Sequence, residues 1–477
     1  MLLPVFATIA SEMEARFRDG LAADPDANRP PDLLAAEEAI ETLLRQLGGA
    51  LLQVYVDDAT EVAVLGRALC PCGRRMHVHR HSRWPRKTLF GTVTVTDPYV
   101  YCRACGSADR PLHSALGTDR ETWSLSAVEA AVDLSSDESC GKAVAKLNRL
   151  FPDVDMGRTT ALRHLHHHGK EARKFIDRKL ADASKLAELP WGLRPPGATE
   201  LEVEFDGGMI PVATLEPIEV AEGEEPKTTP VRGLPKRQKR CRWEEVKAGV
   251  VQKPGETDRL YSLRPTGGLD VAFSDLLSLA CLKGWTEATE VRGLADGAVH
   301  IRPRMEEMFD AGSFKFILDR PHCKEHLSAA GAAMALPDGV SAQDWASTAL
   351  DKLEKGAADD VVAELTQAWV ESGVDVASRN DTLRLEAGYL ARNRDAVAYG
   401  EYRANGWSTA SSEVESAHRH VVQVRLKIAG AWWHPDHVDD ILALRMLKAN
   451  GWWKQYWESQ RSDWRARAKR FAETDGR

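Results

Sequence analysis

The pattern of apolar and polar residues predicts a series of strands and helices in the second half of the chain. Leu201-Glu-Val-Glu-Phe205 alternates, which predicts a strand with one buried face. Four further strands are predicted, at residues 246–251 and 259–263, ending at residue 296, and at residues 314–318. The polar, basic stretch from Lys227 to Arg242 predicts a loop after the first strand.

Helices are predicted between and after these strands. Apolar residues recur at three- and four-residue spacing from Leu269 to Ala280, another helix is predicted through Met305, and the chain is helical in pattern from about 323 to 405. Three strands, a helix, a strand, a helix and a strand form the element order of a ribonuclease-H-like mixed sheet. In such a sheet the first and fourth strands are neighbours. We therefore predict a multidomain α/β protein with this core.

The first half of the chain predicts smaller units before the core. A Pro- and Gly-rich linker from Leu189 to Gly197 separates the two halves. The expected division is into an N-terminal helical region (1–65), a cysteine module (66–110), a helical region (120–190), the first part of the core (198–330), a helical insertion (331–405), and a core return helix with a basic, Trp-rich tail (406–477).

Two pairs of cysteines bound the module at residues 66–110, whose middle, from Thr88 to Thr96, has strand character. The pairs are Cys70 with Cys72 and Cys102 with Cys105, and a glycine follows each pair. Four thiolates can bind zinc tetrahedrally, which predicts a zinc-ribbon-like module. The first pair has one intervening residue, which is tighter than usual, so nearby histidines are alternative ligands. Free buried thiols are the other interpretation. The candidate histidines are His77, His79 and His81.

The region at 120–190 predicts a helix-turn-helix. Ser126 and Glu129 have the spacing of a capping box, and Ala143, Leu147 and Leu150 are expected on one buried helix face. A further helix is predicted from Met156, with Leu162 and Leu165 buried. Its exposed face would carry groups that reach phosphates and bases, although many helical hairpins bind nothing. These candidate DNA-binding residues are Arg158, Thr159, Arg163, His166 and His167.

Three carboxylates are candidates for a catalytic metal site. Asp206 and Asp296 are expected at the ends of the first and fourth strands, each followed by glycine, and Glu415 on a helix that returns to the same edge. Together they would supply oxygen ligands for two Mg²⁺ or Mn²⁺ ions. For each aspartate alone, a turn or helix cap is the simpler explanation.

Two acidic positions leave alternatives open. Asp319 and His322 follow the fifth strand and could brace the active site or form a helix cap. Asp319 is also the competing candidate for the second catalytic carboxylate. Glu413 is an alternative to Glu415.

Charge and composition modify this picture only in part. The 477 residues carry a formal net charge of −8, which argues mildly against nucleic-acid binding, but the basic residues are clustered. Seven of the 14 tryptophans lie between Trp407 and Trp464, interleaved with Arg and Lys. Core packing is expected for Trp432 and Trp433, whereas the last three are open between core packing and stacking on DNA bases. No apolar run is long enough to span a membrane and the amphipathic start is no signal peptide, so a cytoplasmic protein is expected.

Several sequence blocks together resemble bacterial insertion-sequence transposases of the ISKra type, in the wider Mutator-like group. The blocks are Asp206-Gly-Gly-Met, Leu294-Ala-Asp296-Gly-Ala, Asp319-Arg-Pro-His322, and Val414-Glu415-Ser with Arg425-Leu-Lys427. The resemblance spans residues 65–460 and implies a DDE transposase with a ribonuclease-H-like core and a helical insertion before Glu415. It also implies that Asp296 is catalytic and that Asp319 and His322 form an accessory pair.

The same resemblance implies transposon ends and target DNA as partners, a homo-oligomer, and association with a bacterial nucleoid. Two other functions are compatible with the residues. One is a non-catalytic DNA-binding regulator derived from a transposase. The other is a metal-dependent nuclease that cuts without rejoining.

Overall fold

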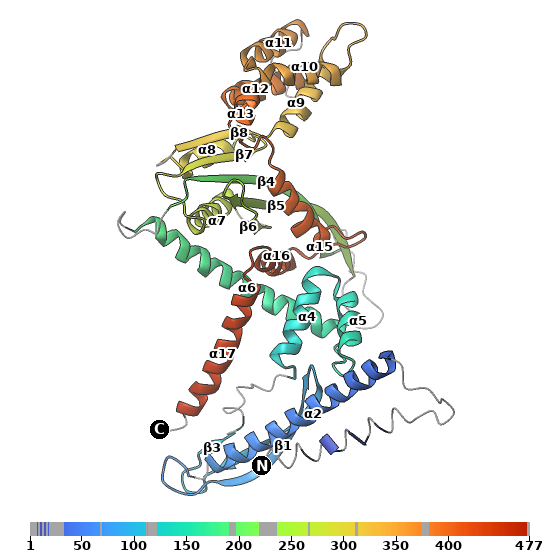
Figure 1. Ribbon diagram of the computed structural model, residues 1–477, viewed down its shortest axis with the longest axis vertical. Coiled ribbons are helices and arrows are strands. Elements are labelled where there is room, and N and C mark those ends of the chain that lie inside the picture. The colour runs from blue at the N-terminus through green and yellow to red at the C-terminus, as the bar shows by residue number, and fades with distance from the viewer. Residues whose placement is uncertain are drawn as a thin grey trace, which may run out of the picture. The chain divides into compact units, whose positions relative to one another are not determined.

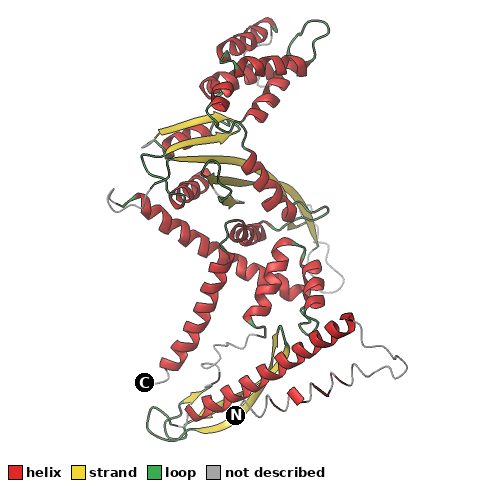
Figure 2. Ribbon diagram, in the orientation of Figure 1, coloured by secondary structure: helices red, strands yellow, loops and turns green. Residues whose placement is uncertain are grey.

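The computed structural model describes residues 33–66, 69–110, 112, 122–189, 197–218, 236–265, 268–310, 313–373 and 381–474, with a few single positions before residue 33. The chain divides into two compact units, one formed by residues 1–165 and 454–477 and the other by residues 166–453. The protein is of mixed α/β class, as predicted. Figures 1 and 2 show the helices and strands of each unit.

The first unit combines a small antiparallel sheet with helices. Its elements are α2 (Leu33–Gly66), β1 (His77–Thr88), β2 (Gly91–Tyr101), β3 (Ala108–Asp109), α4 (Leu125–Asp137), α5 (Cys140–Leu150), the start of α6 (Arg158–Ala187) and most of α17 (Trp453–Thr474). The sheet order is β1-β2-β3. Val93 and Val95 of β2 alternate with exposed residues and pack with Val56 of α2. The strand pattern expected from Thr88 to Thr96 is thus the end of β1, a turn and the start of β2.

The helices α4 to α6 differ in detail from the prediction. Ser124, and not Ser126, is the N-cap of α4, because its side chain accepts the N–H of Ala127. Leu150 is the last residue of α5 and is exposed. Leu162 is also exposed, since the α6 residues that turn inward are Ala161 and Leu165, and consecutive residues point about 100° apart.

The second unit contains a five-stranded mixed sheet. Its elements after α6 are β4 (Glu200–Pro217), β5 (Arg237–Gln252), β6 (Arg259–Arg264), α7 (Leu269–Leu282), β7 (Glu290–Ala295), α8 (Ile301–Met308), β8 (Ser313–Leu318), α9 (Arg320–Ala333), α10 (Ala342–Glu354), α11 (Ala358–Glu371), α12 (Thr382–Asn393), η2 (Arg394–Ala396), α13 (Tyr399–Ala404), α14 (Ser412–Ala417), the π turn η3 (His418–Gln423), α15 (Val424–Leu426) and α16 (Pro435–Ala449). The sheet order is β6-β5-β4-β7-β8.

The sheet separates two layers of helices. β4, β5 and β6 are antiparallel neighbours, whereas β4, β7 and β8 run parallel. Phe205 of β4 stacks on Phe273 of α7, with ring centroids 4.7 Å apart, and Glu204 points to the opposite face, which α14 covers. Helices α9 to α13 follow β8 and extend from that edge of the sheet in Figure 1.

Two expectations for β4 and β5 were wrong. Asp206 is not at the end of its strand, because β4 continues to Pro217. Residues 237–242, expected in a loop, belong to β5 and pair with β4, so the backbone hydrogen bonds of this polar stretch are made in a ladder. The rest of the expected loop, 227–235, lies outside the described residues.

Candidate functional site

Three aspartates lie where the parallel part of the sheet ends. Asp296 and Asp319 directly follow β7 and β8, which pair along their full length. Asp206 lies two residues beyond Glu204, the last residue of β4 that pairs with β7. Because these strands are parallel, the three aspartates converge at one edge of the sheet, where open α/β sheets commonly hold ligands.

The electrostatic surroundings of Asp206 favour a nearby cation. Burial raises the pKa of Asp206, and the charge of Asp296 raises it further, while His418 and His322 act in the opposite direction. The His418 Nε2 atom lies 3.6 Å from Asp206 Oδ2. A cation between two such carboxylates would offset the cost of holding both ionised.

The loop after β7 presents Asp296 in a fixed conformation. Its Oδ1 atom accepts the N–H of Ala298 at 2.9 Å, and its carbonyl accepts the hydroxyl of Tyr389 at 2.7 Å. Gly297 has φ 76° and packs closely against neighbouring side chains, so a side chain there would be both strained and crowded. Asp296 remains half-buried, with carboxylate lone pairs left for a ligand.

Asp319 is engaged by four donors and forms the N-cap of α9. Its Oδ1 accepts the N–H and hydroxyl of Ser411 at 2.6 and 2.9 Å, and its Oδ2 accepts the N–H and ring Nδ1–H of His322 at 2.9 and 2.6 Å. Burial opposes ionisation, yet the bonds from His322 and Ser411 lower the pKa of Asp319 overall. With its lone pairs filled, Asp319 is better suited to bracing the site than to binding metal, which favours Asp296 as the second ligand.

His322 carries the complementary shift. Its hydrogen bond to Asp319 raises the pKa of His322 to about 9 against the effect of burial, and the charges of Asp206 and Asp296 contribute in the same direction. His322 is therefore positively charged at neutral pH in the metal-free protein, near the two aspartates.

His418 was missed by the sequence analysis. It is 2% exposed, and its Nε2 atom lies 3.4 Å from the Asp206 carbonyl oxygen. The ring packs on Gly208, where any Cβ would overlap the imidazole. His418 also begins η3, and π turns are often found at functional sites. The signal that was available is the four-residue spacing from buried Val414 to His418.

Replacing Gly208 by alanine is expected to destabilise the protein by about 1–3 kcal/mol, because the new methyl group meets the His418 ring. In a His418→Ala background most of this cost should disappear, a coupling that urea unfolding of both single variants and the double variant would measure. Gly207→Ala is the matched control, since a Cβ there meets only the flexible side chain of Glu245. Additive costs for Gly208→Ala and His418→Ala would contradict the contact.

Glu204 also escaped the sequence analysis, and it holds the start of α14 on the sheet. It is 1% exposed, and its Oε2 atom accepts the N–H of Val414 at 2.7 Å. Burial raises the pKa of Glu204 to about 8. Next to it, Glu413 forms an ion pair with Arg259 at 2.9 Å, so the structure gives this alternative ligand a partner of its own.

The folded state holds the Glu204 proton up to a pKa of about 8, above the ordinary value of 4.5. It therefore binds more protons than the unfolded state between these values, and this group makes stability fall as pH rises from about 4.5 to about 8. Glu204→Gln should remove that fall and be more stable than wild type at pH 8.5 by about 1–3 kcal/mol. Urea midpoints measured in EDTA at pH 5 and 8.5 test this. An unchanged pH dependence would rule it out.

Glu415 lies on α14 with its side chain largely open to solvent. Its side chain is 59% exposed and lies 3.7 Å from Arg419. In the described part of the chain, no group formed by Asp206, Asp296 and Glu415 has ligand atoms all within 4.8 Å of one another. Glu415 is three residues from His418 on the helix, about 60° around its axis, so it lies at the rim of the site. Its role as a metal ligand stays a prediction.

The four cysteines of the first unit do come together. Their sulfurs all lie within 4.8 Å of one another, with 3.5 Å between Cys70 and Cys105 and 3.7 Å between Cys72 and Cys102. Zinc–sulfur bonds of 2.3 Å in a tetrahedron require sulfurs about 3.8 Å apart. The cluster could therefore hold a structural metal such as zinc. The histidines weighed as substitutes, His77, His79 and His81, are exposed on β1.

The backbone around these cysteines explains how Cys70 and Cys72, with one residue between them, can both face the same metal position. Gly73 donates its N–H to the Cys70 carbonyl, and Gly106 does the same to Cys102, with φ of 80° and 78°. Each glycine thus turns the chain back after its pair. Backbone N–H groups of Cys105 and Ala104 lower the pKa of Cys102 to about 6, which favours its thiolate. Against the hydrogen bond from the Ser107 backbone, the thiols of Cys70, Cys72 and Cys102 raise the pKa of Cys105.

The candidate DNA-binding residues of α6 divide into two sets. Arg158, Thr159, Arg163 and His167 are exposed. His166 is instead part of an internal contact, because its Nδ1 atom lies 3.0 Å from Asp440 Oδ2 and its ring stacks on that of His437. In the first unit, a polar cavity of about 510 Å³ is lined by Lys87, Arg163 and His164 among others.

Two of the tail tryptophans are core residues. Trp457 is fully buried and Trp452 is 6% exposed, so core packing explains both. Trp433 is half-buried and donates its ring N–H to the Leu426 carbonyl at 2.8 Å.

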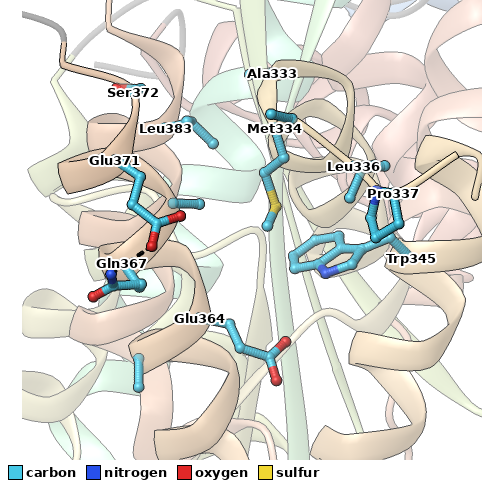
Figure 3. A pocket seen from close by; sticks show the side chains of 13 residues that line it. Ala333, Met334, Leu336, Pro337, Trp345, Glu364, Gln367, Glu371, Ser372 and Leu383 are labelled. Carbon is cyan, nitrogen blue, oxygen red and sulfur yellow. Dashed lines mark hydrogen bonds between the residues drawn. The ribbon is translucent and has the colours of Figure 1, made fainter.

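A second cavity lies in the helices that follow β8. It has a volume of about 750 Å³ and lies between the end of α9 and helices α10, α11 and α12 (Figure 3). Met334 and Trp345 line it with Glu364 and Glu371. None of the candidate residues lines it, so this cavity and the carboxylate site share no side chains.

No protein-family model matches the chain, and the curated proteins compared with it include no match. Within the residues that the structure describes, no helix has the length and apolar character needed to cross a membrane.

Proposed function

We propose that this protein is a DDE-type DNA transposase in which Asp206, Asp296 and Glu415 bind two Mg²⁺ or Mn²⁺ ions. The observation that carries the proposal is the convergence of Asp206 and Asp296 beside neighbouring parallel strands, next to the helix that bears Glu415. The order β6-β5-β4-β7-β8, with three antiparallel strands followed by two parallel ones, supports a ribonuclease-H-like core.

The side chains present fit such ions. Carboxylate oxygens are the ligands that Mg²⁺ and Mn²⁺ prefer, and Asp206 and Asp296 are only half-buried. Glu415 lies at the rim of the site, and its carboxylate would reach the metal ions after a change of side-chain rotamer. When bound, a metal pair supplies activation of the attacking oxygen and stabilisation of the leaving oxygen.

The chain's own residues position these groups. Asp319 holds the backbone at Ser411, and Glu204 holds it at Val414, so both fix the start of the Glu415 helix. The positive charge of His322 balances Asp206 and Asp296 before DNA enters.

Cleavage and joining are both phosphoryl transfers. A water oxygen first bonds to phosphorus as the bond from phosphorus to the 3′-oxygen breaks, which frees a 3′-hydroxyl. That hydroxyl then loses its proton and attacks a target phosphodiester, whose own 3′-oxygen leaves. The cysteine module and the exposed α6 residues would hold the transposon ends. Because two ends must be joined, a homo-oligomer is expected.

One observation favours a second candidate function. The exposed Glu415 paired with Arg419 is also what a DNA-binding regulator with a catalytically inactive core would show.

A cleavage assay separates the transposase from the regulator. A labelled duplex carrying the element's own end is incubated with wild-type protein in Mg²⁺, Mn²⁺ or EDTA. Metal-dependent cutting followed by joining to target DNA supports a transposase. Cutting without joining indicates a nuclease, and binding without cutting indicates a regulator.

A further inference from the structure

β4 and β5 continue beyond the sheet as a two-stranded ribbon. β7 pairs with β4 only as far as Glu204, and β6 pairs with β5 only from Lys247 onward. Past these points β4 and β5 stay paired to Pro217 and Arg237. Figure 1 shows the ribbon running towards α15.

One face of this ribbon carries tryptophans and lysines. Side chains alternate along a strand, so Lys239 and Trp243 share a face. The Trp243 ring meets that of Trp432 edge to face, with centroids 6.4 Å apart, and it is 56% exposed. The Lys239 Nζ atom lies 5.1 Å from the Trp432 centroid, and Lys427 Nζ lies 5.9 Å from the Trp243 centroid. We call Lys239, Trp243, Lys427 and Trp432 the aromatic–lysine face.

The opposite face of the ribbon is electrically balanced. Arg240 pairs with Glu216 at 3.1 Å, and Arg242 pairs with Glu244 at 2.6 Å. By contrast, neither Lys239 nor Lys427 has a carboxylate within ion-pair distance among the residues described. The positive charge of the ribbon is therefore available on the aromatic–lysine face.

We propose that the aromatic–lysine face binds DNA that has an unpaired strand, with Trp243 stacked on a base and Lys239 and Lys427 on phosphates. An exposed indole stacks on any base, and flanking ammonium groups suit a phosphate backbone. Glu245, the acidic residue on the same side of β5, is already paired with Lys247 at 2.8 Å. In a chain of net charge −8, two lysines without a carboxylate partner among the described residues, beside an exposed indole, indicate an anionic partner. The inference rests on the proposed function, in which cleavage exposes strand ends.

Binding of fluorescein-labelled DNA to the full chain tests the face, using a duplex with a 3′ single-stranded tail and a blunt duplex. Trp243→Ala should weaken binding of the tailed duplex about 5- to 100-fold and change the blunt duplex little. Trp243→Phe should restore most of the loss. Lys239→Gln should weaken binding and reduce the salt slope by about one. Arg240→Gln, the neighbour on the balanced face, should stay within about twofold.

Thermal melting should be unchanged in these variants, because the substituted side chains are exposed. Equal affinity of Trp243→Ala and wild type for tailed DNA would overturn the inference while leaving the transposase proposal intact. An effect of Arg240→Gln as large as that of Lys239→Gln would also overturn it, since charge alone would then explain binding. Wild-type protein that binds neither DNA would refute the proposed function itself.

Discussion

Asp206→Asn is expected to lower metal-dependent strand cleavage by about 10³-fold or more while leaving DNA binding intact. A carboxylate that binds both ions supports transition-state stabilisation of several kcal/mol, and each 1.4 kcal/mol is about a factor of ten. The variant should fold, because within the described parts of the chain Asp206 makes no ion pair closer than the 3.6 Å to His418. Asp296→Asn should behave in the same way. Single-turnover cleavage rates at saturating protein measure both effects.

Two further variants make this test discriminating. Asp319→Asn should lose stability as well as activity, because an amide nitrogen would face the donors of Ser411 or His322. Glu415→Gln should abolish cleavage without loss of stability, since the side chain is 59% exposed. Asp270→Asn, at an exposed aspartate of α7 paired with Arg304, is the control. Normal cutting by Asp296→Asn together with a stable but inactive Asp319→Asn would move the second metal ligand to Asp319.

Cys102→Ser is expected to remove bound zinc and unfold the cysteine module. Wild-type chain should purify with about one zinc per molecule. Metal binding can supply on the order of 10 kcal/mol to a small module, and among the described residues the buried core around Cys70 and Cys102 adds Met76 and Val100 alone. The module should then be cut rapidly by protease in the variant and in EDTA-treated wild type. Metal analysis and limited proteolysis measure the two effects.

Cys241→Ser is the matched control, because Cys241 is an exposed cysteine of β5 in the second unit and is not one of the four clustered cysteines. It should keep its zinc and its protease resistance. A metal-free wild-type chain whose module resists protease would show that the four thiols pack without metal.

Local patterns were sufficient to predict much of the fold. The alternation at Leu201–Phe205 correctly marked a strand, but the expectation of one buried face was wrong, because helices cover both faces and all five residues are buried. The spacing from Leu269 to Ala280 marks α7 for the corresponding reason. The tight turns after the cysteine pairs could be predicted from the glycines, because a turn with positive φ depends on the local backbone and not on distant contacts.

The parts that were not predicted depend on contacts between distant segments. The extension of β4 past Asp206 contains Gly207, Gly208 and Pro211, which are poor strand formers alone, and it exists because β5 pairs with it. His166 appears exposed on a helical wheel, but its partner Asp440 comes from α16. Glu204 and His418 belong to the site only through the way α14 and η3 lie on β4.

The π turn of η3 constrains how the chain can change in length. Buried residues recur every four positions at Val414, His418, Val422 and Leu426, a spacing that drifts by about 40° per step on an α-helix. The wider winding of η3 offsets this drift and keeps one line of side chains turned inward. Deleting one residue here would restore α-helical winding and carry Leu426 out of that line. Natural variants are therefore expected to differ in this segment by substitution and to conserve its length.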